Sequence, residues 1–206
     1  MNSRNIQCRC GHIRGLLKPT HLMPHPTLEL VQPSTHLRDS YRALIAEFVA
    51  NGNALVPFTL SFDHTDFDAF LAKLADCAIG VGVPDGFVAH STFWLVRGGT
   101  EVVGVSNIRH ALTPGLLRDG GSIGYGIRPT ARRQGLGIAI LGLSLPRAAE
   151  LGVSRALVTC GEPNVASAKA IMRNGGVLES EEYVADRGEV VQRYWISHPA
   201  SNVLIK

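Results

Sequence analysis

The chain has 206 residues, of which 45% are hydrophobic and 18% are charged, and its formal net charge is +3. These values are typical of a globular protein, and the small positive charge gives no reason to expect a nucleic-acid partner. No run approaches the ~20 consecutive apolar residues of a membrane-spanning helix, so no membrane partner is expected.

The four cysteines favour a reducing, cytoplasmic location over a disulfide framework. Cys77 and Cys160 lie in apolar stretches and are expected to be buried thiols. Cys8, Cys10 and His12 do not have the spacing of the usual zinc patterns, and no second pair follows them. We therefore expect no metal.

Residues 1–27 are predicted to be an extension outside the folded domain. No acidic residue precedes Glu29, whereas arginine, lysine and proline recur. The segment lacks the apolar centre of a secretory signal, and a transit peptide or a true start at Met23 are the alternatives. Disorder is expected in either case, which leaves a single domain over 28–206.

The first part of this domain is predicted to contain one strand and two helices. A short apolar run predicts a strand over 28–31. Apolar residues at helical spacing then predict an amphipathic helix over 37–49, which Asn51-Gly52-Asn53 ends. After an apolar and aromatic linker, a second helix is predicted to begin near Thr65 or Asp66.

Three consecutive strands are predicted next. Ser91–Arg97 and Glu101–Arg109 flank a glycine turn and form the clearest hairpin in the chain. In Gly121–Ile127, small or polar residues alternate with larger apolar ones, which indicates a strand that Pro129 closes. We expect these three strands to be antiparallel.

The last third alternates helices and strands. A helix is predicted from Leu136 to Leu151, a buried strand over Ala156–Cys160, and a second helix over Val165–Asn174. A final hairpin joins 177–184 to 189–196. The whole order predicts an α/β unit attached to antiparallel hairpins.

The segment from Arg132 to Gly137 is basic and rich in glycine, and it leads into the apolar start of a helix. Unpaired N–H groups and the dipole at a helix N-terminus attract anions, and glycine lets a phosphate approach closely. The P-loop pattern is absent here, and so is the third glycine of the dinucleotide fingerprint. Arg132-x-x-Gly135-x-Gly137 instead resembles the pyrophosphate loop of the GNAT superfamily, the Gcn5-related N-acetyltransferases.

A second pattern supports this resemblance. Asn164-x-x-Ser167, followed by Gly175-Gly176, is similar to the second GNAT motif and lies one helix and one strand beyond the loop. The match covers about residues 92–196. The sequences of residues 108–110, 124–129 and 193–196 look like those of one branch of predicted acetyltransferases.

The resemblance implies a GNAT-like fold: a central mixed, mostly antiparallel sheet flanked by helices, with strands that splay apart at the cofactor wedge. It implies acetyl-CoA as co-substrate, with strand backbone binding the pantetheine and the glycine loop binding the pyrophosphate. Glycines at 124 and 126 are expected to make room for the cofactor. The implied contacts are Gly126, Ile127, Arg128, Arg132, Arg133, Gln134, Gly135, Leu136, Gly137, Ile138 and Asn164.

The catalytic residues are less clear, because two familiar ones are absent. Ile171 stands where many GNAT enzymes have a tyrosine, and Gly121-Ser122 stands where others have a glutamate. His110, at the end of its strand, is the candidate base, since its ordinary pKa suits proton transfer near neutrality. A structural role for this histidine is the alternative. The other candidates are Glu101, Glu162 and Tyr125.

The implied activity is acetyl transfer from acetyl-CoA to a primary amine, by direct attack in a ternary complex. The alternative is a non-catalytic acyl-CoA-binding module. The acceptor is expected to be a small-molecule or peptide amine, and pairing of terminal strands in a homodimer is a further expectation. Acceptor specificity is expected to reside in Asn53–His64, Gly80–His90 and Ala111–Gly120, which carry no recognisable code.

Overall fold

The computed structural model describes residues 26–197. Almost all of the predicted extension, residues 1–25, therefore lies outside the described residues, and so do Cys8, Cys10 and His12. Within 26–197, no helix combines the length and the apolar character that a membrane crossing requires.

The strands form two antiparallel sheets. The first sheet has four strands in chain order: β1 (Leu28–Val31), β2 (His90–Arg97), β3 (Glu101–Arg109) and β4 (Ile123–Ile127). The second has three strands in the order β5 (Arg155–Gly161), β7 (Glu189–Ser197) and β6 (Val177–Val184). The α/β fold with mostly antiparallel strands is confirmed, but the predicted central sheet is divided in two.

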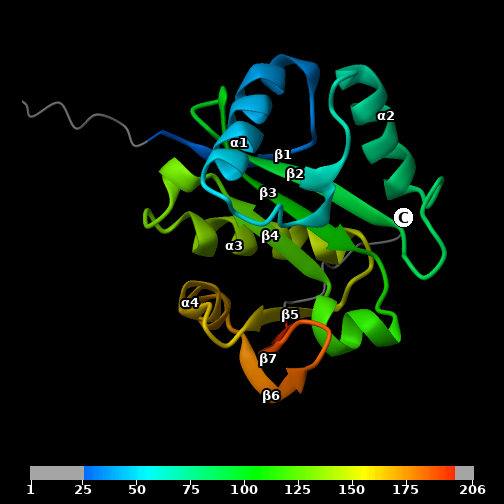
Figure 1. Ribbon diagram of the computed structural model, residues 1–206, viewed down its shortest axis with the longest axis vertical. Helices are drawn as coiled ribbons and strands as arrows, with labels where there is room; N and C mark the ends of the chain where they lie inside the picture. The colour runs from blue at the N-terminus through cyan, green and yellow to red at the C-terminus, as the bar shows by residue number, and fades with distance from the viewer. Residues whose placement is uncertain (1–25, 198–206) are drawn as a thin grey trace, which may run out of the picture.

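Within residues 26–197, four α-helices cover these sheets. Helices α1 (Arg38–Ala50) and α2 (Phe67–Ala78) lie on one face of the first sheet, and α3 (Leu136–Glu150) lies between the other face and the second sheet (Figure 1). Helix α4 (Val165–Arg173) packs beside α3. Asp66 begins α2 with a side-chain cap, because its carboxylate accepts the N–H groups of Asp68 and Ala69.

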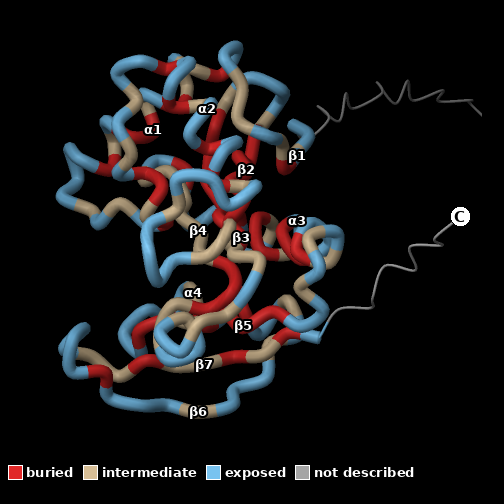
Figure 2. Tube along the Cα trace, turned by 90° about the vertical axis from the view of Figure 1, so that its right-hand side faces the viewer, coloured by how far each residue is buried: buried red, intermediate tan, exposed pale blue. Residues whose placement is uncertain are grey.

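Two apolar cores follow from the alternation of side chains along β2. Trp94 is fully buried against α1 and α2, where it stacks on Tyr41 with ring centroids 4.6 Å apart. Phe93 and Leu95 point to the opposite face and pack with α3 and β5. The first sheet is therefore covered on both sides, and buried backbone runs through the centre of the molecule (Figure 2).

The two sheets meet where β4 begins. Ser122 N–H donates to the Leu157 carbonyl at 2.6 Å, and Leu157 N–H donates to Ser122 Oγ at 3.1 Å. Gly121 permits this approach, because its φ is +67° and a Cβ there would lie 2.7 Å from the Leu157 oxygen. Beyond this contact no backbone hydrogen bond joins β4 to β5 in the described part of the chain. Strand β4 therefore has one paired edge and one free edge.

Candidate functional site

The free edge of β4 presents the backbone of alternate residues. At the two ends of its ladder with β3, Arg109 N–H donates to Ser122 O at 2.8 Å, and Arg128 N–H donates to Val103 O at 2.9 Å. Backbone groups alternate in direction along an antiparallel strand, so Gly124 and Gly126 also face β3. The groups that face the free edge are those of Ile123, Tyr125 and Ile127.

This register shows where the backbone contacts expected from sequence lie. Gly126 and Arg128 were predicted to pair with the pantetheine, but Gly126 and the Arg128 N–H face β3, and the Arg128 carbonyl accepts the Ala131 N–H at 2.9 Å. Ile127 does face the free edge, and Tyr125, which was not among the predicted contacts, faces it as well. Strand parity could have indicated Tyr125, but only with the register of the sheet in hand.

The glycines of β4 are also explained differently from the prediction. A Cβ on Gly126 would collide with the carbonyl oxygen of Val56, in the linker between α1 and α2. A Cβ on Gly124 would lie 3.5 Å from Arg109 Nη1 and 3.7 Å from Pro57 Cβ. Gly126 therefore makes room for the linker on the sheet face, whereas a side-chain methyl group at Gly124 would meet only ordinary contacts there.

The loop before α3 presents a row of unpaired donors. Between 26 and 197, the backbone N–H groups of residues 133–137 have no hydrogen-bond acceptor. Arg133 and Gly135 have φ values of +61° and +77°, and a Cβ on Gly135 would point into open space. Successive N–H groups in such a conformation, at the start of a 15-residue helix, form a concave anion site. Ile138 does not belong to this row, because its N–H donates to Gly135 O at 3.0 Å.

Two arginine side chains lie exposed beside this row of N–H groups. Arg132 donates from Nε to the Ile127 carbonyl at 3.1 Å, and its guanidinium lies 5.4 Å from the centre of the Phe48 ring. Arg133 is exposed, and neither arginine forms an ion pair with any residue that the structure describes. Both are therefore available to an anion held by the loop, as the sequence predicts.

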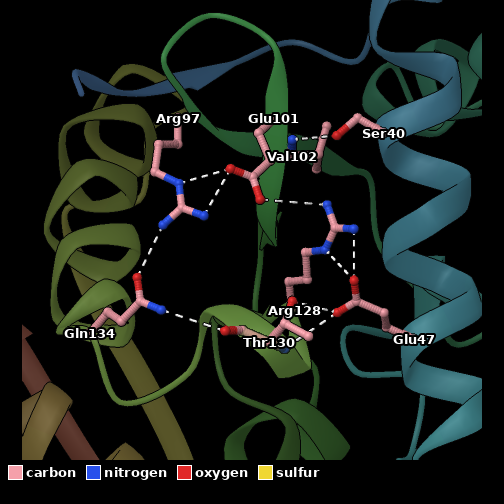
Figure 3. A network of polar contacts seen from close by, with 8 residues as sticks. All are labelled: Ser40, Glu47, Arg97, Glu101, Val102, Arg128, Thr130 and Gln134. Atoms are coloured by element: carbon pink, nitrogen blue, oxygen red, sulfur yellow. Dashed lines mark hydrogen bonds and ion pairs between the residues drawn. The ribbon is translucent and has the colours of Figure 1, made fainter.

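Arg128, in contrast, is engaged by the protein. Its Nε and Nη2 lie 2.7 Å from Glu47 on α1, and its Nη1 lies 3.8 Å from Glu101 on β3 (Figure 3). The other oxygen of Glu47 accepts from the Thr130 hydroxyl at 2.7 Å. Hydrogen bonds from Arg128 and Thr130 lower the pKa of Glu47. This network ties α1 to the loop, and it engages Glu101, one of the candidate bases, with a cation.

The same network reaches the start of the glycine loop. Glu101 pairs with Arg97 at 2.8 Å, and Arg97 Nη1 donates to the side-chain oxygen of Gln134 at 3.0 Å. Gln134 in turn donates to the Thr130 carbonyl at 3.4 Å. The side chain of Gln134 is thus occupied by the protein, and only its backbone N–H is free for an anion.

Asn164 caps α4 with its side-chain oxygen, and its side-chain nitrogen remains available as a donor. Its Oδ1 accepts the Ser167 N–H at 3.1 Å, whereas its Nδ2 has no acceptor among residues 26–197. The Ser167 hydroxyl contacts the Tyr125 hydroxyl at 3.1 Å, which links the cap to β4. Burial raises the pKa of Tyr125, so this phenol keeps its proton at neutral pH.

A cavity of about 310 Å³ lies toward the other end of β4. It is formed by the three segments in which acceptor specificity was expected to reside, together with the ends of β2 and β3. Its lining residues are Phe58, Gly86, Phe87, Val88, His90, Arg109, Thr113, Gly115, Leu116 and Asp119. The tertiary structure therefore brings these three segments to one place.

His90 and Arg109 are the polar residues in this cavity that sequence reasoning missed. His90 is 2% exposed, and Asn107 Nδ2 lies 2.9 Å from its Nδ1. Burial and the nearby charge of Arg109 lower the pKa of His90 to about 4, so it is neutral at pH 7. Arg109 donates from Nη1 to the carbonyls of Gly120 and Gly121, at 2.9 and 3.2 Å.

His110, the predicted base, is not among the residues that line the cavity. Its Nε2 lies 2.9 Å from the hydroxyl of Ser91 on β2, and burial lowers its pKa. The backbone reason is its position one residue beyond Arg109, because neighbouring side chains at a strand end point to opposite sides. The geometry favours the structural alternative for this histidine.

Metal ligands do not cluster anywhere between residues 26 and 197, since no group of three or more His, Cys, Asp or Glu side chains is placed to hold an ion. The donors that are present in the loop are N–H groups and guanidinium groups, which suit an anion. The fit of the described residues is therefore to a phosphate-bearing molecule.

A sequence model of the acetyltransferase (GNAT) domain matches residues 35–177. The chain belongs to the GNAT acetyltransferase family. This GNAT acetyltransferase is an acetyl-CoA-dependent N-acetyltransferase, with acetyl-CoA as its co-substrate. A search of curated proteins finds no significant relative.

Solved structures of acetyltransferases share the fold of this GNAT acetyltransferase. RimL, a ribosomal L7/L12 alpha-N-protein acetyltransferase in complex with coenzyme A, is 20% identical over 84% of this chain and 96% of its own, with a TM-score of 0.57. MccE, a microcin C7 self-immunity acetyltransferase in complex with acetyl-CoA and AMP, is 15% identical over 83% and 92%, with a TM-score of 0.58.

A third similar structure is a chimera of the spermidine N-acetyltransferase SpeG from Vibrio cholerae and hSSAT. It is 13% identical over 82% of this chain and 94% of its own, with a TM-score of 0.53. The names of these three proteins describe different activities, so the shared fold leaves the acceptor of this chain open.

Proposed function

We propose that this acetyltransferase transfers the acetyl group of acetyl-CoA to a primary amine bound in the cavity beside Arg109, by direct attack in a ternary complex. The observation that carries the proposal is the row of free N–H groups at residues 133–137, which lies at one end of β4 while the cavity lies toward the other. One strand edge thus connects an anion site to an acceptor site.

The glycine loop and its arginines would hold the phosphate end of acetyl-CoA. The N–H groups of residues 133–137 would bind the diphosphate, and the exposed Arg132 and Arg133 would bind phosphate oxygens or remain in solvent. The free Nδ2 of Asn164 would donate to an amide carbonyl of the pantetheine. In this assignment Gln134, Leu136 and Gly137 act only through their backbone.

The free edge of β4 would bind the rest of the molecule. Bound acetyl-CoA supplies an activated thioester, whose carbonyl carbon accepts the amine nitrogen. Tyr125 and Ile127 offer edge N–H groups, and a fixed backbone donor of this kind stabilises the negative charge that develops on a carbonyl oxygen. Orientation of the two reactants by one rigid strand contributes further to the rate.

The chemical balance is simple. The lone pair of the amine forms the C–N bond, the C–S bond breaks, and coenzyme A leaves as the thiol after it receives a proton. An ammonium group must first lose its proton before it can attack. The positive charge of Arg109 in the cavity lowers the pKa of a nearby ammonium group and so favours the reactive neutral amine.

A matched pair of glycine variants tests the loop. Gly135 and Gly152 lie just before and just after α3, with φ of +77° and +84°, and a Cβ on either would meet nothing within 4 Å. Gly135→Ala and Gly152→Ala should therefore lower the unfolding free energy by a similar ~1 kcal/mol. Only Gly135→Ala should weaken coenzyme A binding, by about tenfold or more in calorimetry.

Thiol release with a panel of amines then tests the reaction. Coenzyme A binding that is equally strong in both glycine variants would remove the loop from the site. Tight binding of acetyl-CoA without acetylation of any amine would contradict the proposed reaction while leaving the binding site intact.

A further inference from the structure

The cavity beside β4 contains a cation without a carboxylate partner. Arg109 forms no ion pair within residues 26–197, and its only acceptors there are the carbonyls of Gly120 and Gly121, both reached by Nη1. Its Nε and Nη2 donate to no described residue, yet they are not sealed from solvent, and the side chain lines the cavity. The guanidinium therefore keeps free donors that point toward a ligand site.

No described carboxylate pairs with Arg109. Asp119 also lines the cavity, but the cation that it contacts is Arg118, at 3.6 Å. His90 is neutral at pH 7 and lies close enough to feel the charge of Arg109. Burial lowers the pKa of Arg109, with no opposing contribution from a nearby acid. The guanidinium is thus left without an anionic partner among the described residues.

A cation without an anionic partner selects among amines. A partly buried cation is better stabilised when an anion binds it, and a bound carboxylate matches the planar guanidinium fork. A polyamine would instead bring a second cation next to Arg109. The reaction requires an amine, and Arg109 lacks an anionic partner. Both requirements are met by an amine whose own molecule carries an anionic group.

One side of the cavity is aromatic and apolar. Phe58 lies 5.7 Å from Phe87 and 5.0 Å from His90, measured between ring centres, and its ring also lies 5.9 Å from the Arg109 guanidinium. Val88 and Leu116 complete this side. An apolar group on the acceptor would therefore be buried against the aromatic rings while the carboxylate reaches Arg109.

We propose that the acceptor is a small amine that carries both a carboxylate and an apolar side chain, as a free apolar amino acid does, and that Arg109 binds its carboxylate. This inference rests on the proposed function, because the same amine attacks the thioester. A protein N-terminus lacks a carboxylate next to its amine and is therefore disfavoured, and so is a polyamine.

The test compares amines that differ only in the carboxylate. Thiol release from acetyl-CoA is measured with phenylalanine, phenylalaninamide, phenethylamine and spermidine, and leucine with leucinamide provides a second pair. We expect kcat/KM for each amino acid to exceed that for its amide by about tenfold to a hundredfold, the worth of a charge-assisted contact. Spermidine should be the poorest substrate.

Variants of Arg109 show whether this residue produces the preference. Arg109→Gln should abolish the ratio of acid to amide, and Arg109→Lys should keep part of it. A merely structural defect would lower both rates together and leave the ratio unchanged. Arg147→Gln, which removes an exposed arginine on α3, serves as the matched control and should keep the wild-type ratio.

The outcomes separate the inference from the function on which it rests. Equal rates with acid and amide, or faster reaction with spermidine or a peptide N-terminus, would overturn the inference and leave the acetyltransferase intact. Absence of reaction with every carboxylate-bearing amine would also overturn it. Failure of coenzyme A to bind the wild-type protein would overturn the proposed function as well.

Discussion

Two largely buried arginines at opposite ends of the β3–β4 pair have opposite surroundings. Arg128, at the proposed phosphate end, is bound to Glu47 by a hydrogen bond and an ion pair, and it lies near Glu101 as well. Arg109, at the proposed acceptor end, donates only to backbone carbonyls among the described residues. The same residue type thus acts as a structural tie in one place and remains open to a ligand in the other.

The difference lies in what packs against each end of the strand pair. Helix α1 covers the phosphate end and supplies Glu47, whereas an apolar linker and two loops surround the acceptor end. Glu47 stabilises the fold because it neutralises the charge of Arg128. Arg109 has no such partner, and its charge lowers the stability of the fold slightly but remains available to a ligand. Partners, and not residue type, therefore decide the role of an arginine.

The largest expected effect contrasts these two arginines directly. Glu47→Gln removes the carboxylate charge that pairs with the largely buried Arg128, so it should lower the unfolding free energy by about 3 kcal/mol. Arg109→Met removes an unpaired cation, so its unfolding free energy should stay within about 1 kcal/mol of wild type. Urea denaturation at pH 7 measures both, and an equal loss in the two variants would break the comparison.

Acid provides a second measure of the Glu47 contact. Its pKa lies below the ordinary value of 4.5, so its contribution to stability is complete above that pH and is lost as the pH falls through the folded-state pKa. The difference between wild type and Glu47→Gln should therefore shrink toward low pH. A constant difference would mean that the charge of Glu47 does not stabilise the fold.

The two glycines of β4 provide the next contrast. Gly126→Ala places a methyl group onto the backbone carbonyl of Val56 and should lower stability by about 2 kcal/mol. Gly124→Ala meets only ordinary contacts, with Arg109 and Pro57, so a loss well below 1 kcal/mol is expected. Thermal unfolding of the two variants checks this order, and a reversed order would show that the linker does not lie against Gly126.

The last contrast concerns His90 at the acceptor end. Its folded-state pKa of about 4 lies below the unfolded value of 6.5, so the unfolded chain binds a proton first as the pH falls. Stability should decline between pH 6.5 and about 4, by at most ~1.4 kcal/mol per pH unit. His90→Gln should flatten this part of the profile, which denaturation at several pH values would reveal; an unchanged slope would assign the decline to other groups.

Much of the secondary structure could be predicted because its signals are local. The strand over 28–31, the hairpin of β2 and β3 and the end of α4 at Gly175 were all readable from periodicity and turn residues. The division into two sheets could not be predicted from the sequence, because it depends on which strands pair with each other. The single contact of Ser122 with Leu157 joins residues 35 positions apart.

The candidate site shows the same limit. The glycine loop was predicted because its donors lie in one short stretch of sequence, and Asn164 because Asn164-x-x-Ser167 resembles a short family motif. The register with β3 was needed to choose between Gly126 and Tyr125 at the strand edge. His110 was chosen as the candidate base from its ordinary pKa, whereas the burial of His90 against Phe58 is a property of the folded chain.

By itself, the sequence determined the order of the elements, the position of the basic glycine loop and the family resemblance, because each depends on neighbouring residues. Only the tertiary structure decided that β4 has a free edge, that Arg128 is held by Glu47, and that Arg109 lines a cavity without an ion-pair partner among the described residues. Burial, strand register and charge pairing are made by residues distant in the chain, and these properties set what the protein binds.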